Sequence, residues 1–414
     1  MKILLYSLNF KPELTGIGKY NGELAPILAV KSIDVHVLTA PPYYPEWKRH
    51  GGFKNNYSTT LENGVTIYRC PVYVPKNLNM VKRVLHLFSF AFSSALRLIS
   101  LIKLKPDVVF LVQPTLFCAP ITLLYCKITG AKSIMHIQDF EVDAMFGLSN
   151  NTSGKFKKIV RKIESWFLKR FDVVSSISYS MLNNAQIKGV AEKKLLFFPN
   201  WADTDFVTPD VYDASLRKQW GYNEIDKIVM YSGNIGQKQG LEVMLEAAKH
   251  FKSHSNIKFL IIGNGSYSDS LQTMATDFGL DNIVFMPLQP WELVPQILVM
   301  ADVHLVVQKR GAADAVLPSK LTNILSAGGH ALVTADSNTE LGKIATKYTG
   351  IYHCVEPDNT HAFIEGLTYC LNLETIETNT VARQYAVDNL NKQRVIDRFI
   401  KDLKALVAKK GEGL

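Results

Sequence analysis

The sequence predicts an α/β protein made of two doubly wound domains that follow one another along the chain. Three observations support this fold class: short apolar runs typical of buried parallel strands, amphipathic helical segments between them, and an interruption of that alternation near the middle of the chain. With 414 residues, of which 47% are hydrophobic, the chain is long enough for two cores of ordinary size. Two such domains are expected to hold a ligand cleft between the carboxyl ends of their strands.

The strand-like runs of the first half are separated by helix-length amphipathic segments. They lie at residues 2–9, 35–39, 66–70, 108–112, 133–137, 173–177 and 195–198. The segment 199–223 then loses this alternation and is rich in Asp, Thr and Pro. We therefore interpret it as an interdomain connection.

The alternation restarts in the second half, with strand-like runs at 228–232, 258–262, 283–286, 303–307 and 331–334. Helical stretches follow Gly240, Tyr267, Trp291 and Ser319. The segment 391–408 has apolar residues at helical spacing, which predicts a docking helix. We therefore expect an N-terminal domain at 1–200 and a C-terminal domain at 201–390, with the segment 391–414 packing back on the first domain.

Positive charge is concentrated in the first half. Residues 1–200 carry 26 Lys and Arg against 12 Asp and Glu, a net +14, so the total of +9 leaves −5 for residues 201–414. This asymmetry indicates an anionic partner for the first half, either a membrane surface or nucleic acid, with a merely basic surface as the alternative. Because no known nucleic-acid-binding motif or aromatic platform is present, we expect no nucleic-acid partner.

The cysteines and the first residues indicate a cytoplasmic protein. The five cysteines are odd in number, widely spread and without a C-x-x-C pair, which predicts neither a zinc site nor a disulfide framework. The start MKILLYSLNF lacks a cleavage site and alternates like a strand, so it does not resemble a signal peptide. No apolar run reaches membrane-spanning length.

One apolar segment, 80–105, carries the basic residues Lys82, Arg83, Arg97, Lys103 and Lys105. As an interfacial helix it would bury its apolar side chains at the lipid boundary and set its cations against anionic headgroups. The alternative is a long core helix of the first domain. Basic residues at 155–162, followed by Trp166 and Phe167, favour the membrane interpretation slightly.

Two loops after the first strands are candidate ligand-binding loops. Gly16 and Gly18 would let the backbone approach a phosphate at a helix start, although a simple tight turn is the alternative. The spacing is not that of the dinucleotide fingerprint. After the second strand, Tyr43, Tyr44 and Trp47 suit a wall for a sugar or lipid carrier, or else a rigid surface loop.

Polar residues also follow the run at 133–137. His136 and Asp139 lie near the carboxyl end of this run, where hydrogen bonding to sugar hydroxyls or proton transfer would be useful. A buried histidine satisfied by hydrogen bonds is the rival for His136. Glu141 and Asp143, just beyond, either join this site or only start a helix.

The strand ends of the second half carry glycines and cations. Gly233, Asn234 and Lys238 run from one strand into a helix, while Gly263 and Gly265 follow the next strand. Met286 and Leu288 follow a third. In the stretch 307–328, Lys309 and Arg310 end a strand, and the helix start at Ser319 and Lys320 offers bare amides, an arrangement that suits a diphosphate.

The order of these motifs resembles the retaining glycosyltransferases of family 4, which have the GT-B architecture of two Rossmann-like domains around a cleft. The resemblance spans essentially the whole chain. It is especially close to the WcaI-type enzymes of colanic acid exopolysaccharide synthesis, in the strings ELTGIGKY, TAPPYYPEW, HIQDFEVDAM, YSGNIGQKQGLE and VVQKRGAADAVLPSKLTNIL. It implies a peripheral enzyme at the inner face of the cytoplasmic membrane. Such an enzyme would move a hexose-type sugar, such as fucose from GDP-fucose, to a polyprenyl-diphosphate-linked oligosaccharide.

The resemblance also implies roles for the candidate residues. Gly16 and Gly18 would contact the donor diphosphate, and His136 would lie by the transferred sugar. Neutralisation of the leaving diphosphate would fall to Lys238 with Arg310 or Lys309, and backbone amides would come from Ser319 and Lys320. Residues 263–265 and 286–288 would flank the base.

Two positions depart from the family pattern. The family's two glutamates, separated by seven residues, fall here on Ala315 and Asn323, so an amide replaces the acid expected at the donor ribose. The usual arginine after the second-domain glycine is Asn234, and the usual lysine is displaced by one residue to Lys238. Asp314 could substitute for the missing acid.

We expect mainly electrostatic catalysis, in which cations and helix-start amides stabilise the departing diphosphate. If the reaction retains configuration, the departing phosphate would accept the acceptor's proton. No Asp-x-Asp motif occurs, so no metal or other cofactor is required by the sequence. Two alternatives remain: a sugar-nucleotide epimerase of the same architecture, and a non-catalytic membrane scaffold with a degenerate nucleotide site.

Overall fold

A computed structural model describes the chain except for residues 14–15, 78, 114–115, 141–153, 311–317, 374–376 and 409–414. The chain forms two compact units. Unit 1 comprises Met1–Phe198 together with the chain from Ile396 onward, and unit 2 comprises Pro199–Val395. The predicted division after residue 200 lies two residues beyond the end of the first part of unit 1.

Unit 1 is built on an eight-stranded sheet with the order β3-β4-β2-β1-β5-β6-β7-β8. Its strands are β1 (Lys2–Tyr6), β2 (Asp34–Thr39), β3 (Ser58–Glu62), β4 (Val65–Arg69), β5 (Val108–Gln113), β6 (Lys132–Ile137), β7 (Val173–Ser176) and β8 (Leu195–Phe197). All neighbours are parallel except β3 and β4, which form an antiparallel pair at one edge. Each strand-like run of the first half overlaps one of these strands, and only β3 was not predicted.

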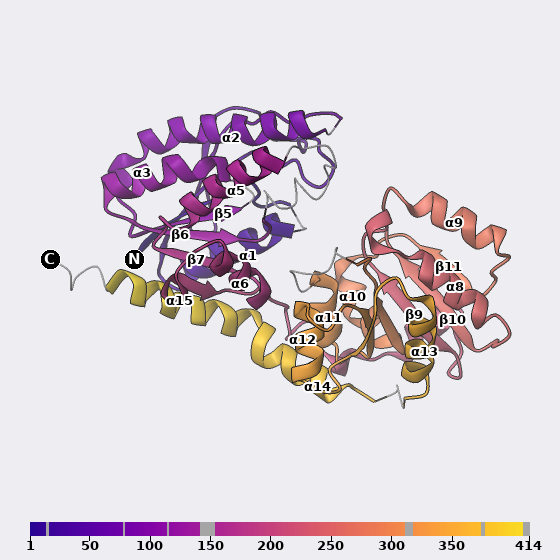
Figure 1. The fold of residues 1–414 in the computed structure, drawn as a ribbon. Coiled ribbons are helices and arrows are strands. Elements are labelled where there is room, and N and C mark those ends of the chain that lie inside the picture. Colours follow the sequence, from indigo (N-terminus) through magenta and orange to yellow (C-terminus); the bar gives the residue numbers. More distant parts are fainter. Residues whose placement is uncertain are drawn as a thin grey trace. The chain divides into compact units, whose positions relative to one another are not determined.

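Helices cover both faces of this sheet. They are α1 (Gly16–Val30), α2 (Met80–Ser100), α3 (Ala119–Thr129), α5 (Gly154–Leu168), α6 (Tyr179–Ile187) and α15 (Lys392–Ala408). On one face Tyr6 hydrogen-bonds to Ser94 of α2 at 2.5 Å. On the other, Phe399 of α15 stacks on Phe198 with ring centroids 4.0 Å apart. Figure 1 shows α2, α3 and α5 on one side of the sheet and α15 on the opposite side.

Unit 2 is built on a six-stranded parallel sheet with the order β11-β10-β9-β12-β13-β14. Its strands are β9 (Lys227–Ser232), β10 (Ile257–Ile262), β11 (Ile283–Met286), β12 (Val303–Val306), β13 (Ala331–Thr334) and β14 (His353–Val355). Its helices are α7 (Ala214–Gln219), α8 (Glu242–His250), α9 (Ser268–Asp277), α10 (Val294–Met300), α11 (Ser319–Ser326), α12 (Glu340–Lys347), α13 (Thr360–Leu371) and α14 (Thr380–Tyr385). The edge strand β14 was not predicted.

Strand β9 explains why this sheet has a core on each face. Ile228 and Met230 point into the cluster formed with α10, α11 and α14. Val229 and Tyr231 point into the cluster formed with α8, α9 and α13. Successive side chains of a strand face opposite ways, so a strand buried on both faces must be apolar throughout, which is the pattern seen in the sequence.

In the parts of the chain that the structure describes, no helix combines the length and apolarity needed to cross a bilayer.

Candidate active site

A buried carboxylate organises the loops at the carboxyl ends of β1 and β2. Glu13 accepts hydrogen bonds from the Asn9 side chain at 2.9 Å and from the backbone amides of Tyr43 and Tyr44 at 2.9 and 3.0 Å. Its side chain is almost completely enclosed, and this burial raises its pKa. Glu13 therefore joins two loops that lie about 30 residues apart in sequence. Sequence reasoning missed it because a single acid in a loop carries no signal of burial.

The glycines Gly16 and Gly18 allow this loop to pack. A Cβ on Gly18 would lie 2.6 Å from the Cβ of Glu13, which no real contact allows. Gly16 has a φ of +56°, in the left-handed region that favours glycine. The two glycines are therefore accounted for by the loop itself, and their contact with a ligand stays a prediction.

The aromatic residues after β2 line a cavity of about 200 Å³, which we call the unit 1 pocket. Among the described residues its lining comprises Leu8, Asn9, Gly16, Ile17, Tyr43, Tyr44, Trp47, Arg83, His86, Leu87 and Asp139. The hydroxyl of Tyr43 lies 2.9 Å from Nε2 of the buried His86, and burial lowers the pKa of this histidine. The structure thus brings the predicted aromatic wall together with Gly16 and Asp139.

His136 does not lie where the sequence-based hypothesis put it. Its side chain is only 2% exposed, inside the core of unit 1, with Nδ1 2.9 Å from the Ser175 hydroxyl. It stacks on Phe110 and packs against Phe198. Burial lowers its pKa to about 3, so the imidazole is neutral at physiological pH. The rival interpretation, a buried and hydrogen-bonded histidine, is the one the structure supports.

The buried position of His136 follows from the pleat of β6. The side chain of His136 points from the strand into the core, next to Val112 of β5 in register. The strand ends one residue later at Ile137, and Asp139 is the exposed residue beyond it. Glu141 and Asp143 lie outside the described residues.

The glycine loops after β9 and β10 pack directly on one another. A Cβ on Gly263 would lie 1.9 Å from the carbonyl oxygen of Gly233, and one on Gly265 would lie 2.0 Å from that of Ile235. The amide of Ile235 donates to the Asn264 carbonyl at 2.9 Å. These glycines are required because two backbones touch here, before any ligand is considered.

A third loop joins them. The Gly263 amide donates to the carbonyl of Met286 at 3.0 Å, which ties the end of β10 to the end of β11. The Leu288 side chain, two residues further on, is largely exposed. The predicted convergence of these strand ends is therefore present in unit 2.

A half-buried cation lies beside this loop cluster. The Nζ atom of Lys320 sits 3.7 Å from the ring centroid of Tyr231 and would touch a side chain at Gly233. Burial lowers its pKa to about 7. In the described part of the chain, Lys320 has no carboxylate partner. It belongs to the first turn of α11, whose N-terminus at Pro318 has no side-chain cap.

The side chain of Lys320 adds to the backbone role that the sequence suggested for Ser319 and Lys320. Ser319 is exposed at the same helix start. Asn323 lies one turn further along α11, on the same side as Lys320. Ala315 stands at the other position where the family has a glutamate. Ala315 and the neighbouring Asp314 both lie outside the described residues. Lys238 and Asn234, after β9, are both exposed.

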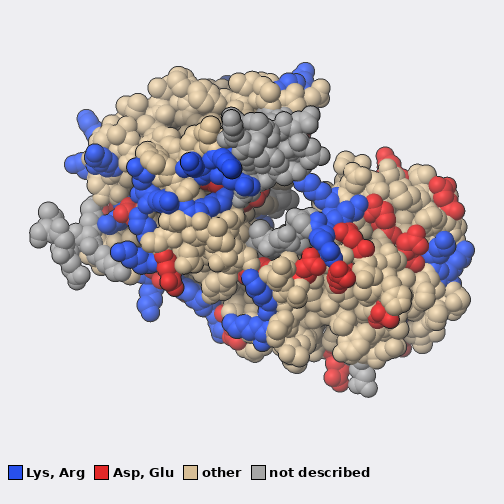
Figure 2. Space-filling model, viewed as in Figure 1, with Lys and Arg blue, Asp and Glu red and all other residues tan. Residues whose placement is uncertain are grey.

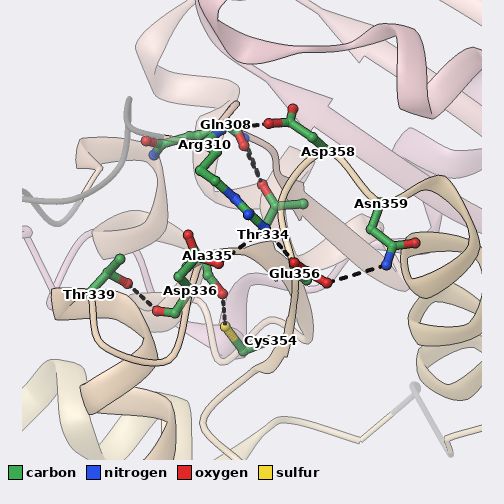
Figure 3. A network of polar contacts seen from close by, with 10 residues as sticks. All are labelled: Gln308, Arg310, Thr334, Ala335, Asp336, Thr339, Cys354, Glu356, Asp358 and Asn359. Carbon is green, nitrogen blue, oxygen red and sulfur yellow. Dashed lines mark hydrogen bonds and ion pairs between the residues drawn. The ribbon is translucent and has the colours of Figure 1, made fainter.

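The basic pair at the end of β12 is neutralised by acids (Figure 3). The Arg310 guanidinium forms ion pairs with Glu356 and, at 3.5 Å, with Asp336. The Arg310 amide donates to Asp358 at 3.1 Å. Glu356 raises the pKa of Arg310. The expected role of Arg310 as a free counter-charge for a diphosphate is therefore not supported.

Lys309 has a similar partner. Its Nζ lies 3.4 Å from Oε1 of Glu242 in α8, and it borders a cavity of about 320 Å³ that also holds Glu246. An added phosphate here would meet carboxylates, because Glu356 and Asp358 line the same cavity. Of the three cations predicted for the diphosphate, only Lys238 has no ion pair among the described residues. The side chain of Lys320, which was predicted for its backbone amide alone, has none there either.

The fold and these loops define a class. Two consecutive parallel α/β units with glycine-bearing strand ends form the GT-B fold of nucleotide-sugar glycosyltransferases. Sucrose-phosphate synthase of Thermosynechococcus elongatus superimposes with a TM-score of 0.76 over 99% of both chains at 13% identity. Anabaena HepE in complex with UDP-glucose gives 0.67 over 98% of this chain and all of HepE, at 14% identity. At such identities the likeness shows the fold alone.

Sequence comparison gives the family. Residues 15–201 match the glycosyl transferase 4-like domain, and residues 213–388 match the glycosyl transferases group 1. The chain is also 47% identical over 410 residues, 98% of its length and 100% of the relative's, to a protein of Escherichia coli (strain K12) provisionally named colanic acid biosynthesis glycosyl transferase WcaI. The chain therefore belongs to this family of glycosyltransferases, as its motifs predicted.

Proposed function

We propose that the protein transfers a sugar from a nucleoside diphosphate to a lipid-linked oligosaccharide in the synthesis of an exopolysaccharide related to colanic acid, with GDP-fucose as the expected donor. Family membership supports glycosyl transfer, and HepE, which shares the fold, is named as a complex with UDP-glucose. The observation that carries the donor site is Lys320, a half-buried cation without a carboxylate partner in the described chain, at an uncapped helix start.

The chemistry follows from where charge develops. As the bond to the sugar breaks, negative charge grows on the diphosphate, and pre-placed cations and helix-start amides stabilise it without reorganisation. Lys320 and the amides of Ser319 and Lys320 would serve this end, with Lys238 as a second, exposed cation. We propose that these groups suffice without a metal. With retention, a departing phosphate oxygen would take the acceptor's proton.

The donor part of this proposal is tested by binding and turnover. We expect GDP, and not UDP, to raise Tm in a thermal-shift screen, and GDP-fucose to be consumed only when a lipid-linked acceptor is present. Consumption that yields an isomeric nucleotide sugar without acceptor would indicate the epimerase alternative. A protein that binds nucleotide and never turns over would indicate the scaffold.

We also propose that the protein works on the surface of a membrane, because α2 exposes an apolar stripe that no other described segment covers. Six large apolar side chains recur every three or four residues along the helix, each between 50% and 69% exposed: Val81, Leu85, Phe88, Phe92, Leu96 and Ile99. The opposite side of α2, with Leu87, Phe90 and Leu98, is buried. Inserting the stripe into a bilayer would contribute on the order of 5 kcal/mol.

The charge around this stripe suits an anionic bilayer. On α5, Ile159, Ile163 and Trp166 are also exposed, and the Arg170 guanidinium lies 3.4 Å from the Trp166 ring centroid. Figure 2 shows an uncharged surface over most of α2, with basic side chains at one end of it and others gathered over α5. Each basic residue near an anionic surface contributes about 1 kcal/mol.

Vesicle flotation tests this surface. The double substitution Phe88→Ser with Phe92→Ser is expected to abolish binding to phosphatidylglycerol vesicles. Leu61→Ser, at an even more exposed apolar residue on β3, is the matched control and should leave binding unchanged. Equal binding of both variants would contradict the role of α2, and equal binding to neutral vesicles would contradict the role of charge.

A further inference from the structure

We propose that the unit 1 pocket is a phosphate-recognition site for the membrane-borne acceptor, with Arg83 as its cation. This inference rests on the proposed transfer to a lipid-linked acceptor. It goes further by naming the chemical group that the pocket binds, a diphosphate attached to a lipid, and the side chain that holds it.

The first support is the electrostatic state of Arg83. It lines the pocket and, in the described part of the chain, forms no ion pair and no side-chain hydrogen bond. Its neighbours Tyr43 and His86 are uncharged at neutral pH, since burial raises the pKa of the phenol and lowers that of the imidazole. Asp139 also borders the pocket, yet no ion pair joins it to Arg83. Among the described residues, the pocket therefore presents a guanidinium that forms no ion pair with a carboxylate.

The second support is the position of the pocket on α2. Arg83, His86 and Leu87 come from the first two turns of this helix, so the positive end of the helix dipole lies at the same place. Val81 and Leu85, in those same turns, belong to the exposed apolar stripe. A helix with its side chains is about 10 Å wide. A headgroup can thus enter the pocket while its lipid tail stays in the bilayer.

The third support is the size and lining of the pocket. Its volume of about 200 Å³ is below the range of roughly 300–1,000 Å³ usual for drug-sized ligands, so it suits a phosphate group or one sugar ring. Tyr44 and Trp47 supply aromatic surface against which a sugar next to the phosphate could pack. Arginine matches phosphate oxygens with paired donors, which a lysine at the same place would not.

Binding of farnesyl diphosphate tests the site without requiring turnover. Full-length protein is titrated with farnesyl diphosphate, farnesol and inorganic diphosphate, using calorimetry and the intrinsic tryptophan fluorescence, to which Trp47 in the pocket contributes. Wild type should bind farnesyl diphosphate, Arg83→Ala should weaken it at least about tenfold, and Arg83→Lys should fall between. Lys82→Ala, the adjacent cation that does not line the pocket, should match wild type. Farnesol binding should not depend on Arg83.

Three results would overturn the proposal: unchanged farnesyl diphosphate affinity in Arg83→Ala, an equal loss in Lys82→Ala, or inorganic diphosphate binding as tightly as the lipid. The last would mean that a free phosphate is the ligand. Turnover separates the site from the function. If transfer proceeds and the acceptor KM of Arg83→Ala is unchanged, the site fails while the function stands. If the lipid diphosphate binds through Arg83 and no transfer occurs, the function fails.

Discussion

The two units differ in the sign of the charge that the fold engages, and each leaves one cation without an ion pair among the described residues. In unit 1 the acid Glu13 is buried and fully engaged by loop amides, while the cation Arg83 lines a pocket without an ion pair among the described residues. In unit 2 the conspicuous cation Arg310 is engaged by acids, while Lys320 has no carboxylate partner in the described chain. A charge that can act on a ligand is one that the fold has left unneutralised, and its prominence in the sequence is a poor guide.

The largest expected effect is a difference in kcat/KM between substitutions of Lys320 and of Arg310. Lys320→Met should lower kcat/KM for transfer by about 10²- to 10³-fold, because it removes a cation from the leaving diphosphate. Its Tm should be unchanged or higher, since the removed charge is half-buried without a carboxylate partner. Arg310→Met, the control, should cost less than about fivefold, as expected for an exposed ion pair. A loss in Arg310→Met as large as in Lys320→Met would reverse the comparison.

Glu13 should matter for stability. Glu13→Ala is expected to lower the free energy of unfolding by about 3 kcal/mol, because it leaves buried donors without an acceptor. Glu13→Gln should cost less, since it keeps one carbonyl acceptor. Urea unfolding followed by circular dichroism measures both.

The pH dependence of that stability gives a second test. Burial raises the Glu13 pKa above 4.5, so the folded protein binds this proton more tightly than the unfolded chain does. Stability contributed by this group therefore falls as pH rises from the ordinary glutamate value through the folded pKa. Glu13→Gln should lack this component, and identical pH profiles would contradict the assignment.

Nucleotide affinity should depend on pH through Lys320. With a pKa of about 7 in the free protein, the ammonium loses its proton as pH rises, and a bound diphosphate would favour the charged form. The affinity for GDP should fall by up to about tenfold per pH unit between pH 7 and the higher pKa of the complex. Lys320→Arg keeps its charge and should show a flat profile by calorimetry between pH 7 and 9.

The smallest effect on catalysis is expected for His136. His136→Ala removes a packed ring and a hydrogen bond with Ser175, so it should destabilise the fold by about 1–3 kcal/mol. The folded fraction should keep kcat within about threefold, a loss far below the 10²- to 10⁴-fold expected of a general acid or base. A much larger loss at unchanged stability would restore the role that the sequence suggested.

Most strands could be predicted because a parallel strand buried on both faces must be apolar. Two strands escaped for physical reasons. β3 is almost entirely exposed, with the polar sequence STTLE, and β14 has only three residues. The edge strands β8 and β11 were predicted because each carries an apolar run. β3 and β14 lack such a run, and a single sequence does not report the pairing with a neighbour that sets them.

Among the site residues, too, some features could be predicted from the sequence and others could not. Glycines that follow strands could be found, because the need for a bare backbone is local. The atoms that these glycines pack against could not be predicted. Gly18 faces Glu13, and Gly263 faces the carbonyl of Gly233. The partners of Arg310 follow it by up to 48 residues. Long-range neutralisation of this kind is invisible to spacing and charge counts.

The contact between the two glycine loops of unit 2 limits how the protein can be changed. Any side chain at Gly263 or Gly265 would drive the ends of β9 and β10 apart, so these positions offer nothing to selection or to a designed library. Asn264, between them, is exposed, as is Leu288 in the neighbouring loop. A designed library can therefore vary these two side chains while the backbone around them stays constant.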